Sequence, residues 1–294
     1  MVEKTPWLDK LTIVSIILGV IIIGFPIYYT LIASTLNLEQ VSTVPMQLYP
    51  GTDFIANAKV AWQRGDLTNQ LINTFIMALG ITVGKIVISM LSAYAIVYFD
   101  FKLRMISFWM IFMTLMLPVE VRILPTYEVA ANVMSPVVKF FGLFNVSVNV
   151  EWSLLNSFPG LILPLIASAT ATFLFRQFFL TIPDELCEAA KMDGATPMQF
   201  FWKILFPLSK TNIAALFVIV FVYGWNQFLW PLLITTDNSM KTAIIGIQEL
   251  IPKADELPEW NVAMAGALFV MIPPILVVIF MQKWFVKGLV ENEK

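Results

Sequence analysis

Six stretches of this chain are apolar over the ~20 residues that a helix needs to cross the hydrocarbon layer of a bilayer. They are residues 11–34, 69–99, 105–131, 154–178, 209–236 and 261–286. The second contains one charge, Lys85, and the third carries charges only toward its far end. Of the 294 residues, 59% are hydrophobic and 13% charged, whereas a soluble domain has about 45–50% and about 25%. The sequence therefore predicts an all-α polytopic membrane protein with about six transmembrane helices, forming a single domain over residues 1–294.

The distribution of Lys and Arg predicts how these spans are oriented, because basic residues accumulate in cytoplasmic loops. If both termini lie inside, eleven of the 18 Lys and Arg residues fall on the inner segments and six on the outer ones. The remaining one, Lys85, lies within a span. We therefore expect both termini in the cytoplasm, with the connection between the fourth and fifth spans on the same side.

The composition also excludes several kinds of chemistry. The chain has no histidine and a single cysteine, Cys187, so it offers neither a His-based catalytic pair nor a Cys-rich or His-rich metal site. Its net charge of −2 gives no reason to expect nucleic acid as a partner. We therefore expect a transport subunit that is not an enzyme, with no catalytic residues, no metal and no cofactor.

One string in the second span, residues 80–86, partly matches the phosphate-binding motif GxxxxGK[ST], whose backbone amides and lysine hold nucleotide phosphates. Gly80, Gly84 and Lys85 have the wrong spacing, and Ile86 stands where the motif needs Ser or Thr. The string also lies within a span. Any ATP that drives this protein is therefore expected to be hydrolysed by another chain.

The connection between the fourth and fifth spans contains residues that are typical of the start and the end of a short helix. Thr181 or Ile182 can cap it, and Pro183 suits its first turn, where a missing N–H costs nothing. Asp184 complements the positive end of the helix dipole. Gly194 stands where a left-handed C-terminal residue is wanted.

A second short helix is expected immediately afterwards. Thr196 and Gln199 have the spacing of a capping box, Pro197 suits the first turn, and Pro207 is expected to end the helix. Residues 181–207 would then form two helices at a tight bend on the cytoplasmic face. From these residues alone, an ordinary amphipathic helix lying on the membrane surface explains the segment equally well.

The residue pattern of this segment resembles the EAA loop of ABC importer permeases. Glu188-Ala189-Ala190 is followed by Gly194 and then by Ile204 and Pro207, with Phe206 in place of the usual leucine. Further stretches resemble one branch of that family, the permeases of sn-glycerol-3-phosphate importers within the maltose-type class. These stretches are residues 116–122, 167–179, 206–212, 223–231 and 288–290.

The resemblance implies a type I ABC importer fold with a cytoplasmic coupling-helix (EAA) loop at residues 181–207. In that family the loop enters a groove on a cytoplasmic ATP-binding subunit, and the motif glutamate pairs with that subunit. The residues implied in coupling are Glu188, Ala189, Ala190, Asp193, Gly194, Ile204 and Pro207. The implied partners are two copies of an ATP-binding subunit, a second homologous permease, an external (periplasmic) solute-binding protein and the lipid of a bacterial inner membrane.

Polar residues inside spans are costly and commonly face protein or a cavity, so they are candidates for the solute pathway. Lys85 could attract an anionic solute, or form an internal ion pair or snorkel at a subunit interface. Arg122 could bind phosphate through two hydrogen bonds, or pair with Glu120 or Glu128. Asn226 and Gln227 could exchange hydrogen bonds with a polyol, or bond to neighbouring helices. The candidate pathway residues are therefore Lys85, Glu120, Arg122, Asn226 and Gln227.

Together these features predict the translocating subunit of an importer for sn-glycerol 3-phosphate or a related glycerophosphodiester, driven by a separate ATPase. Two alternatives remain open from the sequence. One is a permease of the same fold for a neutral sugar or oligosaccharide. The other is an ion-coupled secondary transporter, which would work without an ATPase partner.

Overall fold

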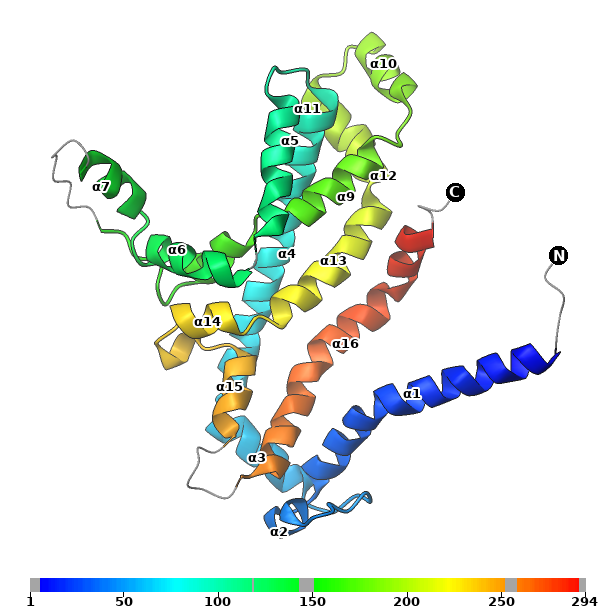
Figure 1. Cartoon of the computed structure of the whole chain (residues 1–294), viewed down its shortest axis with the longest axis vertical. Coiled ribbons are helices and arrows are strands. Elements are labelled where there is room, and N and C mark those ends of the chain that lie inside the picture. Colours follow the sequence, from blue (N-terminus) through cyan, green and yellow to red (C-terminus); the bar gives the residue numbers. More distant parts are fainter. Residues whose placement is uncertain (1–5, 118, 143–150, 252–257, 291–294) are drawn as a thin grey trace. The chain divides into compact units, whose positions relative to one another are not determined.

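The computed structural model describes residues 6–117, 119–142, 151–251 and 258–290, and within these ranges the chain is helical, with no β-strand (Figure 1). The helices are α1 (Pro6–Thr35), α2 (Leu38–Ser42), α3 (Phe54–Arg64), α4 (Leu67–Tyr98), α5 (Arg104–Met113), α6 (Val119–Ala131), α7 (Ser135–Gly142), α8 (Phe158–Ile162), α9 (Ala169–Phe179), α10 (Asp184–Met192), α11 (Pro197–Phe200), α12 (Phe206–Leu208), α13 (Lys210–Trp225), α14 (Leu229–Ile234), α15 (Ala243–Leu250) and α16 (Trp260–Val290). Short 3₁₀ turns lie at Thr114–Met116, Leu163–Leu165 and Asn238–Met240, and a π-helical turn at Phe201–Leu205.

Three helices are long and apolar enough to cross a membrane unbroken, over Lys10–Thr35, Leu67–Tyr98 and Trp260–Lys283. Three further candidates are pairs of helices that meet at a bend: Phe158–Leu165 with Ala169–Phe179 at 51°, Pro197–Leu208 with Lys210–Trp225 at 72°, and Arg104–Met116 with Val121–Ala131 at 108°. If each bent pair is one span, the described residues contain up to six. The expected all-α fold with about six spans is confirmed.

Three of the expected spans differ from simple helices. The stretch 154–178 is interrupted between Leu165 and Ala169, where its two helices meet at 51°. The apolar stretch 209–236 is not continuous, because α13 ends at Trp225 and a new helix, α14, begins at Leu229. Pro231 lies in the first turn of α14, where its missing N–H has no intrahelical partner to lose, so it suits a helix start better than a helix interior. The stretch 105–131 likewise turns by 108° between Met116 and Val121.

The described residues fall into two compact units. The first contains residues 1–68 and 246–272, and the second contains residues 69–245 and 273–294, so α4 and α16 each contribute to both.

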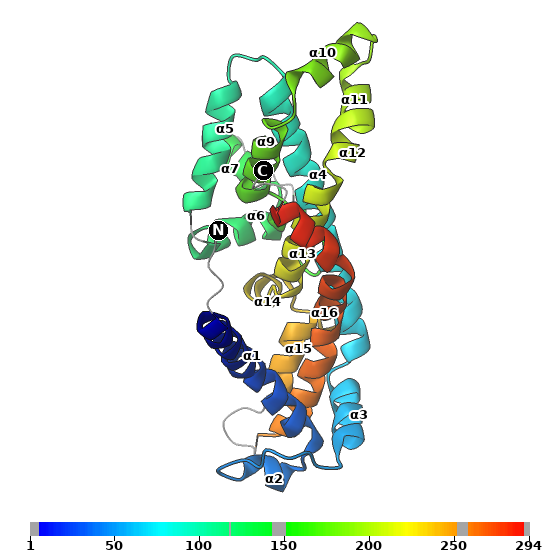
Figure 2. The same cartoon turned by 90° about the vertical axis from the view of Figure 1, so that its right-hand side faces the viewer.

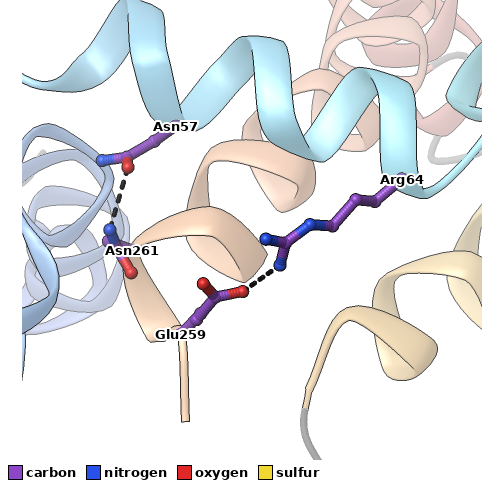
Figure 3. A network of polar contacts seen from close by, with 4 residues as sticks. All are labelled: Asn57, Arg64, Glu259 and Asn261. Atoms are coloured by element: carbon purple, nitrogen blue, oxygen red, sulfur yellow. Dashed lines mark hydrogen bonds and ion pairs between the residues drawn. The ribbon is translucent and has the colours of Figure 1, made fainter. Parts of the chain in front are cut away.

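Asn57 of α3 is the polar centre of the first unit (Figure 3). Its buried side chain donates from Nδ2 to the backbone oxygens of Ser34 (2.9 Å) and Leu36 (2.7 Å), at the end of α1. Its Oδ1 accepts from Nδ2 of Asn261, in the first turn of α16, at 2.8 Å. One side chain therefore ties α1, α3 and α16 together.

An apolar layer and an ion pair surround this link. Ile32, Ala33 and Leu36 of the α1 end form a small buried cluster with Val41 of α2. Arg64, at the end of α3, forms an ion pair with Glu259 (Figure 3). The hydrophobic contacts and Asn57 lie in the interior of the unit, whereas the ion pair lies on its surface.

Helix α4 is the centre of the second unit, and small residues on it let other segments approach closely. A Cβ at Gly80 would lie 2.6 Å from Ile162 Cδ1, and a Cβ at Gly84 would lie 2.5 Å from Ile166 Cγ2. These glycines, four residues apart, have the spacing at which small residues allow helices to pack in a bilayer. The two glycines of the string that partly resembled a phosphate-binding motif are therefore packing residues.

We expect Gly84→Leu to destabilise the second unit by about 1–3 kcal/mol, the usual cost of overpacking a well-filled contact. Ile166→Ala in the same chain should recover part of this loss, because it removes the side chain that the new Cβ meets. The measurement is the unfolding midpoint of the purified protein in detergent. Gly19→Leu in α1 is the matched control, since a Cβ there meets nothing within 4 Å. Equal losses for Gly19→Leu and Gly84→Leu would show that the contact with Ile166 is not the cause.

Candidate functional site: a two-helix loop and a cationic cavity

The loop at residues 181–207 begins with α10, whose N-terminus differs in one detail from the prediction. Pro183, not Thr181 or Ile182, is the N-cap residue, and its extended backbone leads into the helix at Asp184 without a side-chain cap. Thr181 Oγ1 instead donates to the backbone oxygen of Phe178 at 2.7 Å, so it closes the end of α9. The predicted complement to the helix dipole is confirmed by the acidic residues of the first turn.

The end of α10 is closed by Gly194, as predicted. Its φ of +72° is the left-handed conformation that glycine adopts without steric cost. The N–H of Gly194 donates to the Lys191 oxygen at 3.0 Å, and the N–H of Ala195 donates to the Ala190 oxygen at 2.9 Å. This pair of bonds is a Schellman motif, which satisfies the last carbonyls and turns the chain sharply toward α11.

Replacing Gly194 should destabilise this turn through backbone conformation alone, because a Cβ there meets nothing within 4 Å. We expect Gly194→Ala to cost about 1–2 kcal/mol locally, and Gly194→Asn less, since asparagine tolerates the left-handed region better. Hydrogen exchange of the α10 amides measures the effect. Gly142→Ala is the control, because Gly142 also has open space around it but not a positive φ. Unchanged protection of α10 in Gly194→Ala would contradict this account.

The second helix of the loop starts and ends as predicted. Thr196 and Gln199 form the capping box, with each side chain accepting from the other's backbone N–H. The helix runs through the π-helical turn and α12 and ends at Leu208, one residue after Pro207, and α13 then begins at Lys210 at an angle of 72°. A proline in a helix clashes with the carbonyl four residues before it. The wider π turn directly upstream accommodates Pro207.

The loop folds onto α4 and α9 through an aromatic cluster. Tyr94 Oη donates to the backbone oxygen of Pro197 at 2.8 Å, and its ring lies 5.2 Å from that of Phe201. The ring of Tyr98 lies 5.2 Å from that of Phe200. Both views show α10 and α11 at the end of α4 where the chain turns toward α5 (Figures 1 and 2). A force on the loop therefore reaches α4 through a packed contact.

The predicted coupling residues divide between an inner and an outer face. Ala190 is buried in the aromatic core, and Ile204 is partly buried against it. The others are exposed: Glu188, Ala189, Asp193, Gly194 and Pro207. Met192, on the same helix, is 88% exposed. A charged side chain and a large apolar side chain are thus presented outward by α10.

The second unit also contains a cavity of about 750 Å³. Its walls come from α4, from the segment 111–117, from α6, from residues 167–174 and from α13. The lining is apolar for the most part, with a few polar side chains, namely Lys85, Ser92, Thr114, Arg122, Ser168, Thr170, Thr172 and Tyr223. Apolar walls with few polar groups are typical of small-molecule sites.

Two of the predicted pathway residues, Lys85 and Arg122, line this one cavity. Lys85 is 8% exposed, and its Nζ lies 3.9 Å from the centre of the Tyr223 ring, a cation–π contact. The ion pairs found in the described part of the chain do not include either cation. Glu128, one of the two carboxylates expected to pair with Arg122, forms an ion pair with Lys139 instead.

The remaining pathway candidates lie elsewhere. Glu120 belongs to α6, but its side chain lies outside the described part of the structure. Asn226 and Gln227 lie in the break between α13 and α14 and are not among the residues that line the cavity. Gln227 Nε2 donates to the backbone oxygen of Tyr223 at 3.1 Å, so its contact with the cavity is indirect.

Sequence reasoning missed Tyr223 and the polar turn at Ser168. Ser168 caps α9, accepting on Oγ from the N–H of Ala171 at 3.3 Å. Its backbone oxygen accepts from Ser89 Oγ at 3.3 Å, which joins the start of α9 to α4. A serine after a run of apolar residues is a recognisable helix-start signal, but it does not reveal that the helix start faces a cavity.

The chain is similar in fold to two solved structures. One is the crystal structure of a bacterial ABC transporter involved in the import of the acidic polysaccharide alginate, with a TM-score of 0.76, 20% identity and coverage of 97% of this chain and 100% of that one. The other is a bacterial alginate ABC transporter in complex with an alginate pentasaccharide-bound periplasmic protein, with a TM-score of 0.65, 17% identity and coverage of 94% and 92%. The likeness confirms the expected fold of a type I importer permease.

Curated relatives match over their full length. The sn-glycerol-3-phosphate transport system permease protein UgpE of Escherichia coli O1:K1 / APEC is 52% identical over 300 residues, covering all of both chains. The proteins of the same name from Pectobacterium atrosepticum (51%) and Yersinia pestis (52%) match over the same extent. The family model described as "Binding-protein-dependent transport system inner membrane component" matches residues 85–291, which include the cavity and the loop. The chain belongs to this family of inner-membrane components of binding-protein-dependent transport systems.

Proposed function

We propose that this chain is a translocating subunit of an ATP-binding-cassette importer for sn-glycerol 3-phosphate or a related glycerophosphodiester. The observation that carries the proposal is the meeting of Lys85 and Arg122 in one cavity with largely apolar walls. A buried cation in a span is costly, and an anionic solute gives a reason for it that a neutral sugar does not. The name and the full-length identity of the relatives support the same solute class.

The loop at residues 181–207 is the proposed contact with the ATP-binding subunit. An exposed Glu188 and an exposed Met192 on a short helix that ends in a Schellman motif suit a docking surface for an ATP-binding subunit. The small residues Ala189 and Gly194 would let that subunit's backbone approach, while Ala190 anchors the helix to the aromatic cluster. Asp193, Ile204 and Pro207 complete the proposed coupling set. In this proposal the chain itself is not an enzyme, and residues 1–294 form a single transmembrane permease domain.

The proposed assembly contains two copies of the ATP-binding subunit, a second homologous permease and an external solute-binding protein. The orientation follows from the distribution of basic residues, with both termini in the cytoplasm. The loop then lies on the cytoplasmic side, where ATP is available. Among the solved structures of the same fold, one holds a periplasmic protein carrying its solute, which supports an external partner of this kind.

Affinity purification of this subunit, followed by reconstitution of what copurifies, tests the proposal. We expect an ATP-binding subunit to copurify and sn-glycerol 3-phosphate to stimulate its hydrolysis when the binding protein is added. Uptake of sn-glycerol 3-phosphate should resist competition by maltose-like sugars. Competition by those sugars would favour the neutral-sugar alternative. Uptake that needs no ATPase and stops when an ion gradient is dissipated would overturn the proposal in favour of a secondary transporter.

A further inference from the structure

Lys85 combines two properties that rarely occur together. It is almost fully buried, and across the described residues no carboxylate forms an ion pair with it. Removing an ammonium from water is costly unless another group compensates. The compensating group here is the π face of Tyr223, 3.9 Å from Nζ.

The choice of a ring rather than a carboxylate has an electrostatic consequence. A carboxylate would cancel the charge of Lys85 and compete with any anion that entered the cavity. The face of an aromatic ring attracts a cation through its quadrupole but carries no net charge. Lys85 is thereby stabilised while its full positive charge remains available, and Arg122 adds a second charge on the same cavity.

The start of α9 adds hydrogen-bond donors to this cavity. Ala169, Thr170 and Ala171, its first three residues, line it. The N–H of Ala171 is taken by the Ser168 cap, but within the described structure the N–H groups of Ala169 and Thr170 have no acceptor. The first N–H groups of a helix and its positive dipole end favour anions.

The start of α9 also lies next to Lys85. Ser89 follows Lys85 by four residues, which places both on one face of α4. Ser89 Oγ donates to the backbone oxygen of Ser168, the cap residue of α9. The hydrogen bond therefore fixes the first turn of α9 against the turn of α4 that follows Lys85.

We propose that this cavity seats the phosphoryl group of the solute between Lys85, Arg122 and the first turn of α9, and that Tyr223 is the residue that positions Lys85 for it. The inference rests on the proposed function and deepens it, since it makes the permease itself selective for anions. Two contacts hold Tyr223 in place. A Cβ at Gly224 would lie 3.1 Å from Ala78 Cα, so α13 crosses α4 at close range. The side chain of Gln227 donates a hydrogen bond from Nε2 to the backbone oxygen of Tyr223.

The test uses the complete importer in proteoliposomes, with sn-glycerol 3-phosphate as the probe and saturating binding protein. Uptake and solute-stimulated ATP hydrolysis are measured together, and their ratio gives solute moved per ATP. We expect Lys85→Met to lower this ratio roughly tenfold or more, as for the loss of a charge-assisted hydrogen bond. The loaded binding protein can still stimulate hydrolysis, because the loop is unchanged. Lys102→Met, an exposed lysine between α4 and α5, is the matched control and should keep the ratio.

The variants of Tyr223 show whether its aromatic face, which positions Lys85, or merely the volume of its side chain is needed. Tyr223→Phe keeps the π face and should stay within about twofold of the parent protein, whereas Tyr223→Leu should lower the ratio as Lys85→Met does. Tyr223→Glu gives Lys85 a carboxylate partner, so the subunit should assemble and yet lose uptake. This variant keeps the test decisive if Lys85→Met does not assemble.

The outcomes distinguish the inference from the proposed function. A parent importer that does not take up sn-glycerol 3-phosphate refutes the proposed function. A parent importer that does, with Lys85→Met or Tyr223→Glu keeping the full ratio, refutes the phosphoryl seat alone. Equal behaviour of Tyr223→Phe and Tyr223→Leu refutes the positioning role of the ring.

Discussion

Glu188→Ala should abolish solute-stimulated ATP hydrolysis and uptake in the reconstituted importer while leaving the subunit folded. Glu188 is exposed on α10, whereas buried Ala190 and the Schellman turn are what hold the described part of the loop together. The expected loss of hydrolysis and uptake is therefore attributed to weaker docking of the proposed ATP-binding subunit. Truncating one member of a charge pair that becomes buried at an interface costs about 2–5 kcal/mol, which weakens docking at least tenfold.

The measurement is the hydrolysis rate with and without loaded binding protein, together with the amount of ATP-binding subunit that copurifies. Glu185→Ala is the matched control, because Glu185 is an exposed glutamate on the first turn of the same helix. We expect Glu185→Ala to retain stimulation. Normal stimulation in Glu188→Ala would remove Glu188 from the coupling role, and loss in both variants would point to the net charge of α10 instead.

The loop was predictable from the sequence because its determinants are local. Gly194 adopts the left-handed conformation that only a glycine adopts freely, and Thr196 with Gln199 forms a capping box within one turn. The error at the loop has a local cause as well. Thr181 had a nearer acceptor at the end of α9, so Pro183 became the N-cap residue of α10.

The cavity was only half predictable. A charged residue in an apolar stretch is costly unless it faces protein or a cavity, so Lys85 and Arg122 could be named in advance. Their partners could not, because Tyr223 lies far along the chain from Lys85 and joins it only when α13 crosses α4 at Gly224. The turn between Met116 and Val121 and the break between α13 and α14 were also hidden, since hydropathy reports how apolar a stretch is and not whether its helix is continuous.

The first unit presents two polar links whose strengths should differ greatly. The Arg64–Glu259 ion pair joins side chains that are 58% and 33% exposed, and such pairs contribute at most about 1 kcal/mol. Asn57 is buried, and its removal leaves two carbonyl oxygens of the α1 end and the amide of Asn261 without a partner. Each unsatisfied buried group costs about 1–3 kcal/mol. The buried amide, not the ion pair, should hold this unit together.

Asn57→Ala should therefore destabilise the first unit by about 3 kcal/mol or more, and Arg64→Gln by less than about 1 kcal/mol. Asn57→Asp is the informative variant, because it keeps the shape of the side chain but turns an oxygen toward the oxygens of Ser34 and Leu36. If donation to those carbonyls is what matters, Asn57→Asp should be at least as damaging as Asn57→Ala. Unfolding in detergent and protease cleavage after α1 measure the order of the three variants. A harmless Asn57→Asp would show that volume alone is needed at this site.

The loss of stability in Asn57→Ala should concentrate on α1. No residue of its most apolar stretch is buried, so its attachment in this unit depends on its last turn.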